Sequence, residues 1–353
     1  MTFGFIWLTF GLVYVFIEYG LLGNLTVYPS TGNQYDFNSA LLFGSIGSFI
    51  AGLLQGWIEV TWLRRKFGHY PFWTKLLFKS TFYLVFVILF LITLTLITNA
   101  IRFNSSLLHP DVINSLWQFI SRFSFWSMVI LIGVILQVAF FYSEMSQYVG
   151  DGVLFNYLFG KYHKPKHEVR IFMFLDMKSS TSIAEKIGHE NYFDLLKAYY
   201  ADMTDAILET SGEIYQYVGD EIVVTWIKKE GIENNNCLHC FAKISDKIEK
   251  KREGYLKSFG LVPEFKAGYH IGSVTTGEIG IIKKDIIHTG DVLNTTARIQ
   301  AECNTYNVKT LISEDLLNEL QNDGEFSSAR IGEIVLRGKS EPIGLFSISI
   351  QNK

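Results

Sequence analysis

Two aspartates stand where short, apolar, strand-like runs end. Asp176 follows the run VRIFMFL directly, and Asp220 lies in the Gly-Asp pair between EIYQYV and EIVVTW. The second pattern is typical of a β-hairpin with an acidic residue at its tip. Two carboxylates presented from neighbouring strand ends form a natural site for hard divalent cations, which prefer oxygen ligands. Aspartate is also common in turns for conformational reasons alone, so that alternative stays open at this point.

The residues after Asp176 suggest a phosphate site. The segment MKSST, residues 177–181, opens a predicted helix. The N–H groups at a helix N-terminus bind phosphate well. A metal pair beside such a phosphate cradle is the layout of two-metal nucleotidyl chemistry.

The part of the chain that carries these residues alternates strand and helix patterns. A helical pattern capped by Ser and Thr over 179–212 ends at Gly212. The hairpin follows, then a charged helical region, a strand with glycines, a turn leading into a helix, and further strands; these cover 234–259, 264–280, 288–306, 308–313 and 331–350. This order predicts an α+β domain built on one sheet.

The first part of the chain has a different composition. Only 12 of the 65 Lys, Arg, Asp and Glu residues fall within 1–150. Four apolar stretches there are each near the roughly 20 residues that span a bilayer, at 3–22, 40–63, 77–99 and 123–142. Trp62, Trp73, Trp117 and Tyr142 lie near their ends, as interfacial aromatics do. Buried soluble helices are the alternative, but four such lengths in succession with so few charges argue against them.

Basic residues set the expected orientation. The connection after the second stretch carries Arg64, Arg65, Lys66, Lys75 and Lys79, whereas 24–38 carries no basic residue and 101–122 carries two. Because basic loops stay inside, we predict that the N-terminus and everything after about Tyr142 are cytoplasmic, in an inner or plasma membrane. Glu18 and Glu59 lie in or near spans, where an ionisable group suggests function; solvation at an interface is the equal alternative.

These patterns predict a membrane domain of four helices over 1–142, a linker over 143–168 and a cytoplasmic catalytic domain over 169–353. Apolar residues recur at helical spacing in the linker, but Gly150 and Gly152 weaken a long helix. The linker is either a transmission segment or a passive connector. The net charge of −3 gives no reason to expect nucleic-acid binding.

Five motifs then resemble one known family. FLDMKSST, YQYVGDEIVV, GYHIGSVTTGEIG, TGDVLNTTARI and LRGKSEP occur in the order, and close to the spacing, of a class III nucleotidyl cyclase catalytic domain, over about residues 168–350. The resemblance implies a ferredoxin-like βαββαβ core, with a mixed sheet and flanking helices. It also implies synthesis of a 3′,5′-cyclic nucleotide and release of pyrophosphate, with two divalent cations (Mg2+ or Mn2+) as cofactors.

The resemblance also assigns roles. Asp176 and Asp220 match the metal-binding aspartates, with the backbone carbonyl of Met177 as a further ligand. Ser179, Ser180 and Thr181 match the phosphate turn, and Arg337 stands where the family usually has a triphosphate-binding lysine. Arg298 matches the arginine that stabilises the transition state, and Asn294 matches the asparagine that positions the ribose.

The base-selecting positions depart from the family pattern. The adenine-selecting lysine falls on Gln216, and its partner falls on Ile287. Glutamine can donate and accept hydrogen bonds, so it can read either purine, whereas isoleucine offers only packing. Asp285 or Thr289 could substitute for Ile287 if the strand is bulged. By analogy with the family we expect ATP as the substrate, with GTP as the alternative.

In this family the site forms between two catalytic domains. The resemblance therefore implies a homodimer with two equivalent sites, in which Asp176 and Asp220 face the partner's Gln216, Ile287, Asn294 and Arg298. Closed two-fold symmetry is the default for homo-oligomers. A guanylate cyclase and a catalytically silent, cyclase-like regulatory module remain alternatives to an adenylate cyclase.

Overall fold

The computed structural model describes the chain except residues 30–33, 68–69, 151–152, 322–323, 336–340 and 351–353. It divides into two compact units, Met1–Asp151 and Gly152–Lys353, which are described in turn.

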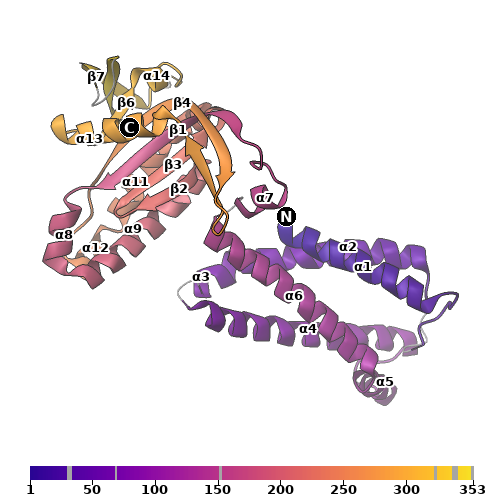
Figure 1. The fold of residues 1–353 in the computed structure, drawn as a ribbon. Helices are drawn as coiled ribbons and strands as arrows, with labels where there is room; N and C mark the ends of the chain where they lie inside the picture. Colours follow the sequence, from indigo (N-terminus) through magenta and orange to yellow (C-terminus); the bar gives the residue numbers. More distant parts are fainter. Residues whose placement is uncertain (30–33, 68–69, 151–152, 322–323, 336–340, 351–353) are drawn as a thin grey trace. The chain divides into compact units, whose positions relative to one another are not determined.

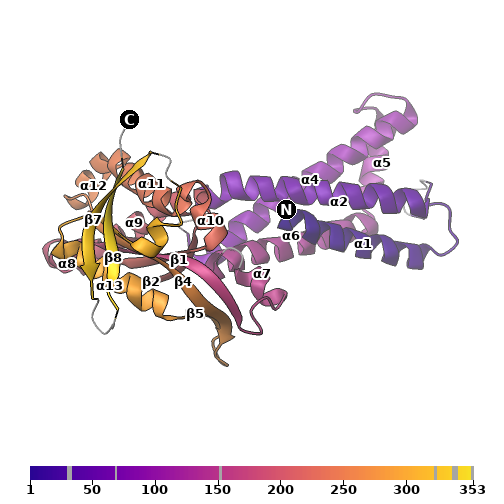
Figure 2. The same ribbon diagram turned by 90° about the horizontal axis from the view of Figure 1, so that it is seen from above.

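The first unit is helical (Figures 1 and 2). Its elements are α1 (Thr2–Leu22), α2 (Phe37–Ile58), a π-helical turn η1 (Glu59–Leu63), α3 (Arg64–Phe67), α4 (Phe72–Phe103), α5 (Pro110–Ile120) and α6 (Phe123–Val149). Helix α1 packs along α2, and α6 contacts both α1 and α4. Four helices over the four predicted stretches are long and apolar enough to cross a membrane, which confirms that prediction.

Four charged side chains meet in the interior of this unit. Lys79 of α4 pairs with Glu59 of η1, and its Nζ lies 3.0 Å from Glu144 Oε1 of α6. Lys75 Nζ lies 3.3 Å from Glu144 Oε2, and the Tyr83 hydroxyl donates to Glu59 at 3.1 Å. Glu59, Lys79 and Glu144 are each 1% exposed. The expectation that Glu59 could be solvated at an interface is therefore wrong, because two lysines neutralise the two buried glutamates.

The second unit is built on a mixed sheet. Its strand order in the described residues is β2-β3-β1-β4-β6-β8-β7, with β5 paired to β4. The strands are β1 (Lys166–Met177), β2 (Glu213–Val218), β3 (Glu221–Ile227), β4 (Phe265–Ile279), β5 (Asp285–Thr289), β6 (Thr310–Ser313), β7 (Phe326–Ile334) and β8 (Ile343–Ile350). The helices are α7 (Val153–Leu158), α8 (Ser180–Ile187), α9 (His189–Glu209), α10 (Lys228–Ile232), the 3₁₀ turn η2 (Glu233–Asn235), α11 (Asn236–Lys250), α12 (Arg252–Phe259), α13 (Asp291–Thr305) and α14 (Glu314–Leu317).

The core of this sheet has the expected ferredoxin-like topology. The elements β1-α9-β2-β3-α11-β4 give the spatial order β2-β3-β1-β4, with every neighbouring pair antiparallel. After β4, the connection through α13 leads to β6, which pairs with β4 in parallel. The sheet is therefore mixed, as expected.

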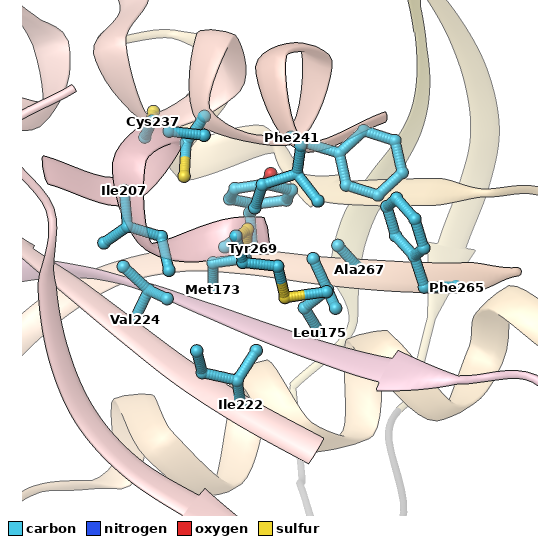
Figure 3. Close-up of a cluster of buried hydrophobic side chains, with 14 of the residues drawn as sticks. Met173, Leu175, Ile207, Ile222, Val224, Cys237, Phe241, Phe265, Ala267 and Tyr269 are labelled. Atoms are coloured by element: carbon cyan, nitrogen blue, oxygen red, sulfur yellow. The ribbon is translucent and has the colours of Figure 1, made fainter. Parts of the chain in front are cut away.

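Strand β1 is buried on both faces, which explains its continuous apolar run. Met173 and Leu175 pack against α9 and α11 in one cluster, which Figure 3 shows together with Phe241 of α11. Phe172 and Phe174 point to the opposite face and pack against α13. Full burial of such side chains stabilises the fold by about 1.5–3 kcal/mol each. Since directions alternate along a strand, Asp176 shares the α13 face.

Two element boundaries differ from the expectation. The helix predicted over 179–212 is broken into α8 and α9 at Gly188, whose φ of +82° is left-handed and interrupts helical hydrogen bonding. The predicted linker begins inside a continuous helix, because α6 runs to Val149, and its last residues already belong to β1, which starts at Lys166.

Candidate active site

Asp176 lies near the end of β1, between two other strands. It pairs with Glu221 of β3 on one side and with Lys266 of β4 on the other. Lys266 Nζ lies 3.4 Å from Asp176 Oδ2, and Gln300 Nε2 of α13 donates to the same oxygen at 3.2 Å. The sheet register and α13 therefore fix this carboxylate from three directions.

Asp220 reaches Asp176 through the predicted hairpin, which the structure confirms. Val218 of β2 pairs with Glu221 of β3, so only Gly219 and Asp220 form the turn. Gly219 has a φ of +64°, a conformation that glycine adopts without steric cost. The Asp220 carboxylate lies within hydrogen-bonding reach of Asp176.

Asp176, Asp220 and Glu221 lie close together, and Lys266 acts on Asp176 and Glu221. Burial, followed by the neighbouring Asp220, raises the pKa of Asp176 above its usual value, while Lys266 and Gln300 oppose the shift. Burial and the charges of Asp176 and Asp220 raise the pKa of Glu221 to about 7. Both shifts have the same physical origin, because negative charges placed together away from water disfavour ionisation.

Among the described residues, no three His, Cys, Asp or Glu side chains come together as a metal site. The neighbouring pair Asp176 and Asp220 nevertheless offers carboxylate oxygens. Carboxylate oxygens are the ligands that Mg2+ and Mn2+ prefer. Asp176, Asp220 and the carbonyl of Met177, the last residue of β1, would hold such ions. The cations would polarise phosphate oxygens and lower the pKa of a bound hydroxyl.

A cavity adjoins Asp176. Its volume is about 430 Å³, and the residues from Met177 to Thr181 line it together with Asp176 and Lys266. Ser179 has a φ of +56° and caps α8, which begins at Ser180. The first N–H groups of a helix lack intrahelical acceptors and favour anions. Ser179, Ser180 and Thr181 are therefore brought to the cavity together with Asp176, as the sequence predicted.

The two predicted residues of α13 lie elsewhere. Asn294 and Arg298 are one helical turn apart; Asn294 is exposed and Arg298 is half-buried. Among the described residues of α13, Cys303 and Asn304 near its end line the cavity. Asn294 and Arg298 do not. Within one chain, the carboxylates therefore lie beside the phosphate turn, but Asn294 and Arg298 do not line the same cavity.

The two base-selecting positions do not share a face of the sheet. Gln216 is exposed and pairs with Val223, which packs in the α13-side cluster. In β5, the His288 ring contacts the Tyr215 ring at 4.8 Å between centroids, and Tyr215 belongs to the same cluster, so His288 lies on that side. Ile287 is half-buried and directly precedes His288 in the strand. Because successive side chains of a strand point to opposite faces, Ile287 points to the other face.

The proposed bulge in β5 is absent from its described register, which runs continuously from Asp285 to Thr289. Asp285 or Thr289 was expected to take the place of Ile287 only if β5 were bulged, so the structure gives no support for either substitute. The register shift lies in β2 instead, between Ile214 and Gln216. A β-bulge re-aims neighbouring side chains, here beside Gln216.

Burial also decides the protonation of His288. Its Nδ1 lies 2.8 Å from the Thr276 hydroxyl, and burial, then the charge of Arg170, lowers the pKa of His288 to about 4. The imidazole is therefore neutral at physiological pH.

Arg337 lies outside the described residues, so the structure gives no position for this predicted phosphate ligand. Conversely, three residues at the site were missed by sequence reasoning: Lys266, Gln300 and Glu221. A lysine inside the apolar run EFKAGYH was a usable signal, since a charge in a buried strand needs a partner. Gln300 had no such signal, because its contact depends on how α13 crosses the sheet.

Comparisons with known proteins agree with this geometry. A family model described as the adenylate and guanylate cyclase catalytic domain matches residues 161–348, more than half of the chain. "Adenylate cyclase 2" of Rhizobium meliloti (strain 1021) is 34% identical over 209 residues, covering 59% of this chain and 58% of that protein. "Adenylate cyclase" of Anabaena cylindrica is 30% identical over 184 residues, covering 50% of this chain and 36% of that protein. The chain thus spans less than two thirds of either relative.

A solved structure shares the fold. The structure of a bacterial light-regulated adenylyl cyclase aligns with a TM-score of 0.54 at 19% sequence identity, covering 63% of this chain and 65% of that chain. At this identity the likeness establishes the fold alone.

Proposed function

The chain belongs to the adenylate and guanylate cyclase catalytic domain family, and from this premise we propose that it converts ATP to 3′,5′-cyclic AMP and pyrophosphate. The observation that carries the proposal is the neighbouring pair of carboxylates, Asp176 and Asp220, with Asp176 lining the same cavity as the phosphate turn. Two relatives bear the name adenylate cyclase, and this supports the choice of ATP over GTP as the substrate.

The residues divide the reaction between them. Asp176 and Asp220 would hold the divalent cations, and the amides of Ser179 to Thr181 would bind the β- and γ-phosphates. The ribose 3′-hydroxyl attacks the α-phosphate, its proton leaves to solvent, and the bond to pyrophosphate breaks. Arg298 stabilises the charge that develops at the α-phosphate, and Asn294 orients the ribose. Arg337 completes the phosphate ligands as a guanidinium in place of a lysine.

The active form is a homodimer with two shared sites. Support comes from the separation within one chain, where Asn294 and Arg298 are absent from the described lining of the cavity beside Asp176. A second copy related by two-fold symmetry would supply them to this cavity and receive the same residues in return. Gln216 would then contact the base in one site while Asp220 of the same chain serves the other.

The four long apolar helices anchor the enzyme in an inner or plasma membrane, with the N-terminus and the catalytic domain in the cytoplasm. Basic residues after the second span support this orientation. Lys75 and Lys79 carry less weight in that argument because they are paired with Glu144 in the interior. Arg64, Arg65 and Lys66 remain as the positive-inside signal.

The test is to incubate the purified full chain in nanodiscs with ATP or GTP and Mn2+, and to identify the product by mass spectrometry. We expect cyclic AMP from the wild type and about a hundredfold less, or lower still, from Asp220→Asn. If the protein forms cyclic GMP from GTP but no cyclic AMP from ATP, it is a guanylate cyclase. A folded protein that turns over neither nucleotide would be the silent module and would refute the proposal.

A further inference from the structure

A cavity of about 860 Å³ lies in the first unit, far along the sequence from the residues that hold nucleotide. Helices α1, α2 and α6 line it, together with Phe119 of α5 and part of the segment after α1. Most of its wall is apolar, with Trp7, Phe10, Leu131 and Ile132 among the lining side chains. This volume is in the range of cavities that hold a small organic molecule.

One carboxylate faces this apolar space. Glu18 lines the cavity, and its two oxygens accept hydrogen bonds from Tyr14 at 2.7 Å and Tyr28 at 3.3 Å. Within the described ranges no lysine, arginine or histidine forms an ion pair with it. Its situation contrasts with that of Glu59 and Glu144, which lysines neutralise in the same unit. A carboxylate that lies in an apolar wall without a cation carries a free-energy cost that a bound cation would relieve.

A second polar group in the wall also lacks a partner. The hydroxyl of Ser124, at the start of α6, is buried and makes no hydrogen bond to the described residues. Most buried polar atoms in proteins are satisfied, so such a group calls for a bound partner.

We propose that this cavity binds an apolar molecule carrying one protonated amine, with the amine on Glu18 and the apolar body along α1 and α6. The amine supplies the positive charge that the described chain does not, and the unpartnered Ser124 hydroxyl lines the same cavity. The walls replace water around its hydrocarbon part at about 25 cal/mol per Å² of buried area.

The proposal is tested by direct binding, without reference to nucleotide turnover. The full chain is placed in nanodiscs of zwitterionic lipid and dialysed against decylamine, decanol or decanoate, with empty nanodiscs measuring partition into lipid. We expect saturable binding of decylamine beyond the lipid background, and at least tenfold weaker binding of decanol and decanoate.

Variants locate the site. Glu18→Gln should weaken decylamine binding at least tenfold, and Glu18→Asp, which keeps the charge, should weaken it less. Asp36→Asn is the matched control, because Asp36 is an exposed acid that caps α2 and does not line the cavity. Met128→Trp, which fills the cavity, should remove the binding altogether. Thermal unfolding monitored by tryptophan fluorescence verifies that each variant is folded.

The proposal is overturned if decanol or decanoate binds the wild type as tightly as decylamine, which would show that charge plays no part. It is also overturned if folded Glu18→Gln binds decylamine within twofold of the wild type. If Glu18→Gln does not fold, the ranking of the three probes on the wild type and the loss in Met128→Trp decide the question.

Discussion

Glu59 and Glu144 in the first unit are almost completely buried and face two lysines. Asp176 and Asp220 in the second unit are only partly buried, and Lys266 pairs with Asp176. In the first cluster the charges balance, and three helices are tied together by it. In the second cluster they do not balance, and the pKa of Asp176 is raised. Similar carboxylates are thus held differently: removing one partner from the first cluster would leave a buried charge unpaired, whereas the crowded carboxylates of the second cluster disfavour their own ionisation.

Lys79→Met should have the largest effect on stability. It leaves Glu59 without its lysine and removes half of the pairing of Glu144, and breaking a buried pair costs about 3–5 kcal/mol. Thermal unfolding of the nanodisc-bound protein, followed by tryptophan fluorescence, would measure the loss. Adding Glu59→Gln should restore part of it.

Lys66→Met is the control for that experiment. Lys66 is exposed and lies over the Trp62 ring at 5.2 Å, an interaction worth about 0.5–1 kcal/mol. If Lys79→Met melts at the same temperature as Lys66→Met, the buried cluster does not stabilise the unit.

Asp220→Asn should have the opposite effect to Lys79→Met, a large loss of activity without a loss of stability. We expect turnover to fall by about a hundredfold or more, the scale on which the loss of one charge-stabilising group acts. The melting temperature of the metal-free protein should stay equal or rise, because one of the crowded charges is gone. Cyclic AMP formation at saturating Mn2+ and thermal unfolding give the two readings.

Asp194→Asn is the matched control, an exposed aspartate on α9 that pairs with Lys197 at 2.9 Å. It should change neither reading. If Asp220→Asn is strongly destabilised, Asp220 has a structural role like Glu59 and Glu144. The two clusters would then not differ in function.

Mixing two inactive variants tests whether the unbalanced cluster is completed by a partner. In a dimer of Asp220→Ala with Arg298→Ala, one site receives both defects and the other receives neither. Random pairing of equal amounts gives about half mixed dimers, so co-expression should restore about a quarter of wild-type activity. Mixed dimers that are recovered by tagging both chains yet stay inactive would show that Asp220 and Arg298 act within one chain.

The sequence predicted the parts of these clusters that are local. Asp176, Asp220 and the phosphate turn follow from strand, hairpin and helix-start patterns only a few residues long. The four long helices follow equally from local composition. The break at Gly188 was not predicted, although its cause, a left-handed φ of +82°, is local.

The residues that balance or support the carboxylates come from far along the chain, and sequence alone did not find them. Lys79 and Glu144 are 65 residues apart, and Gln300 lies 124 residues from Asp176. Such contacts depend on strand register and helix crossing rather than on a local pattern. The same holds for Ile287, because the face it occupies is set by the pairing of β5 with β4.

The smallest effect is expected at Gln216, an exposed and neutral residue on the same hairpin as Asp220. If its amide reads the base, Gln216→Ala loses one or two hydrogen bonds, each worth about 0.5–1.5 kcal/mol. The preference for ATP over GTP, measured as the ratio of kcat/KM values, should then narrow by about twofold to tenfold. Tyr217→Phe is the control, because Tyr217 follows directly but packs on Tyr200 at the opposite face. Because no charge is removed, the metal dependence of turnover should stay as in the wild type. A ratio unchanged from the wild type would show that Gln216 does not contact the base, and that selection depends on other residues of the pocket.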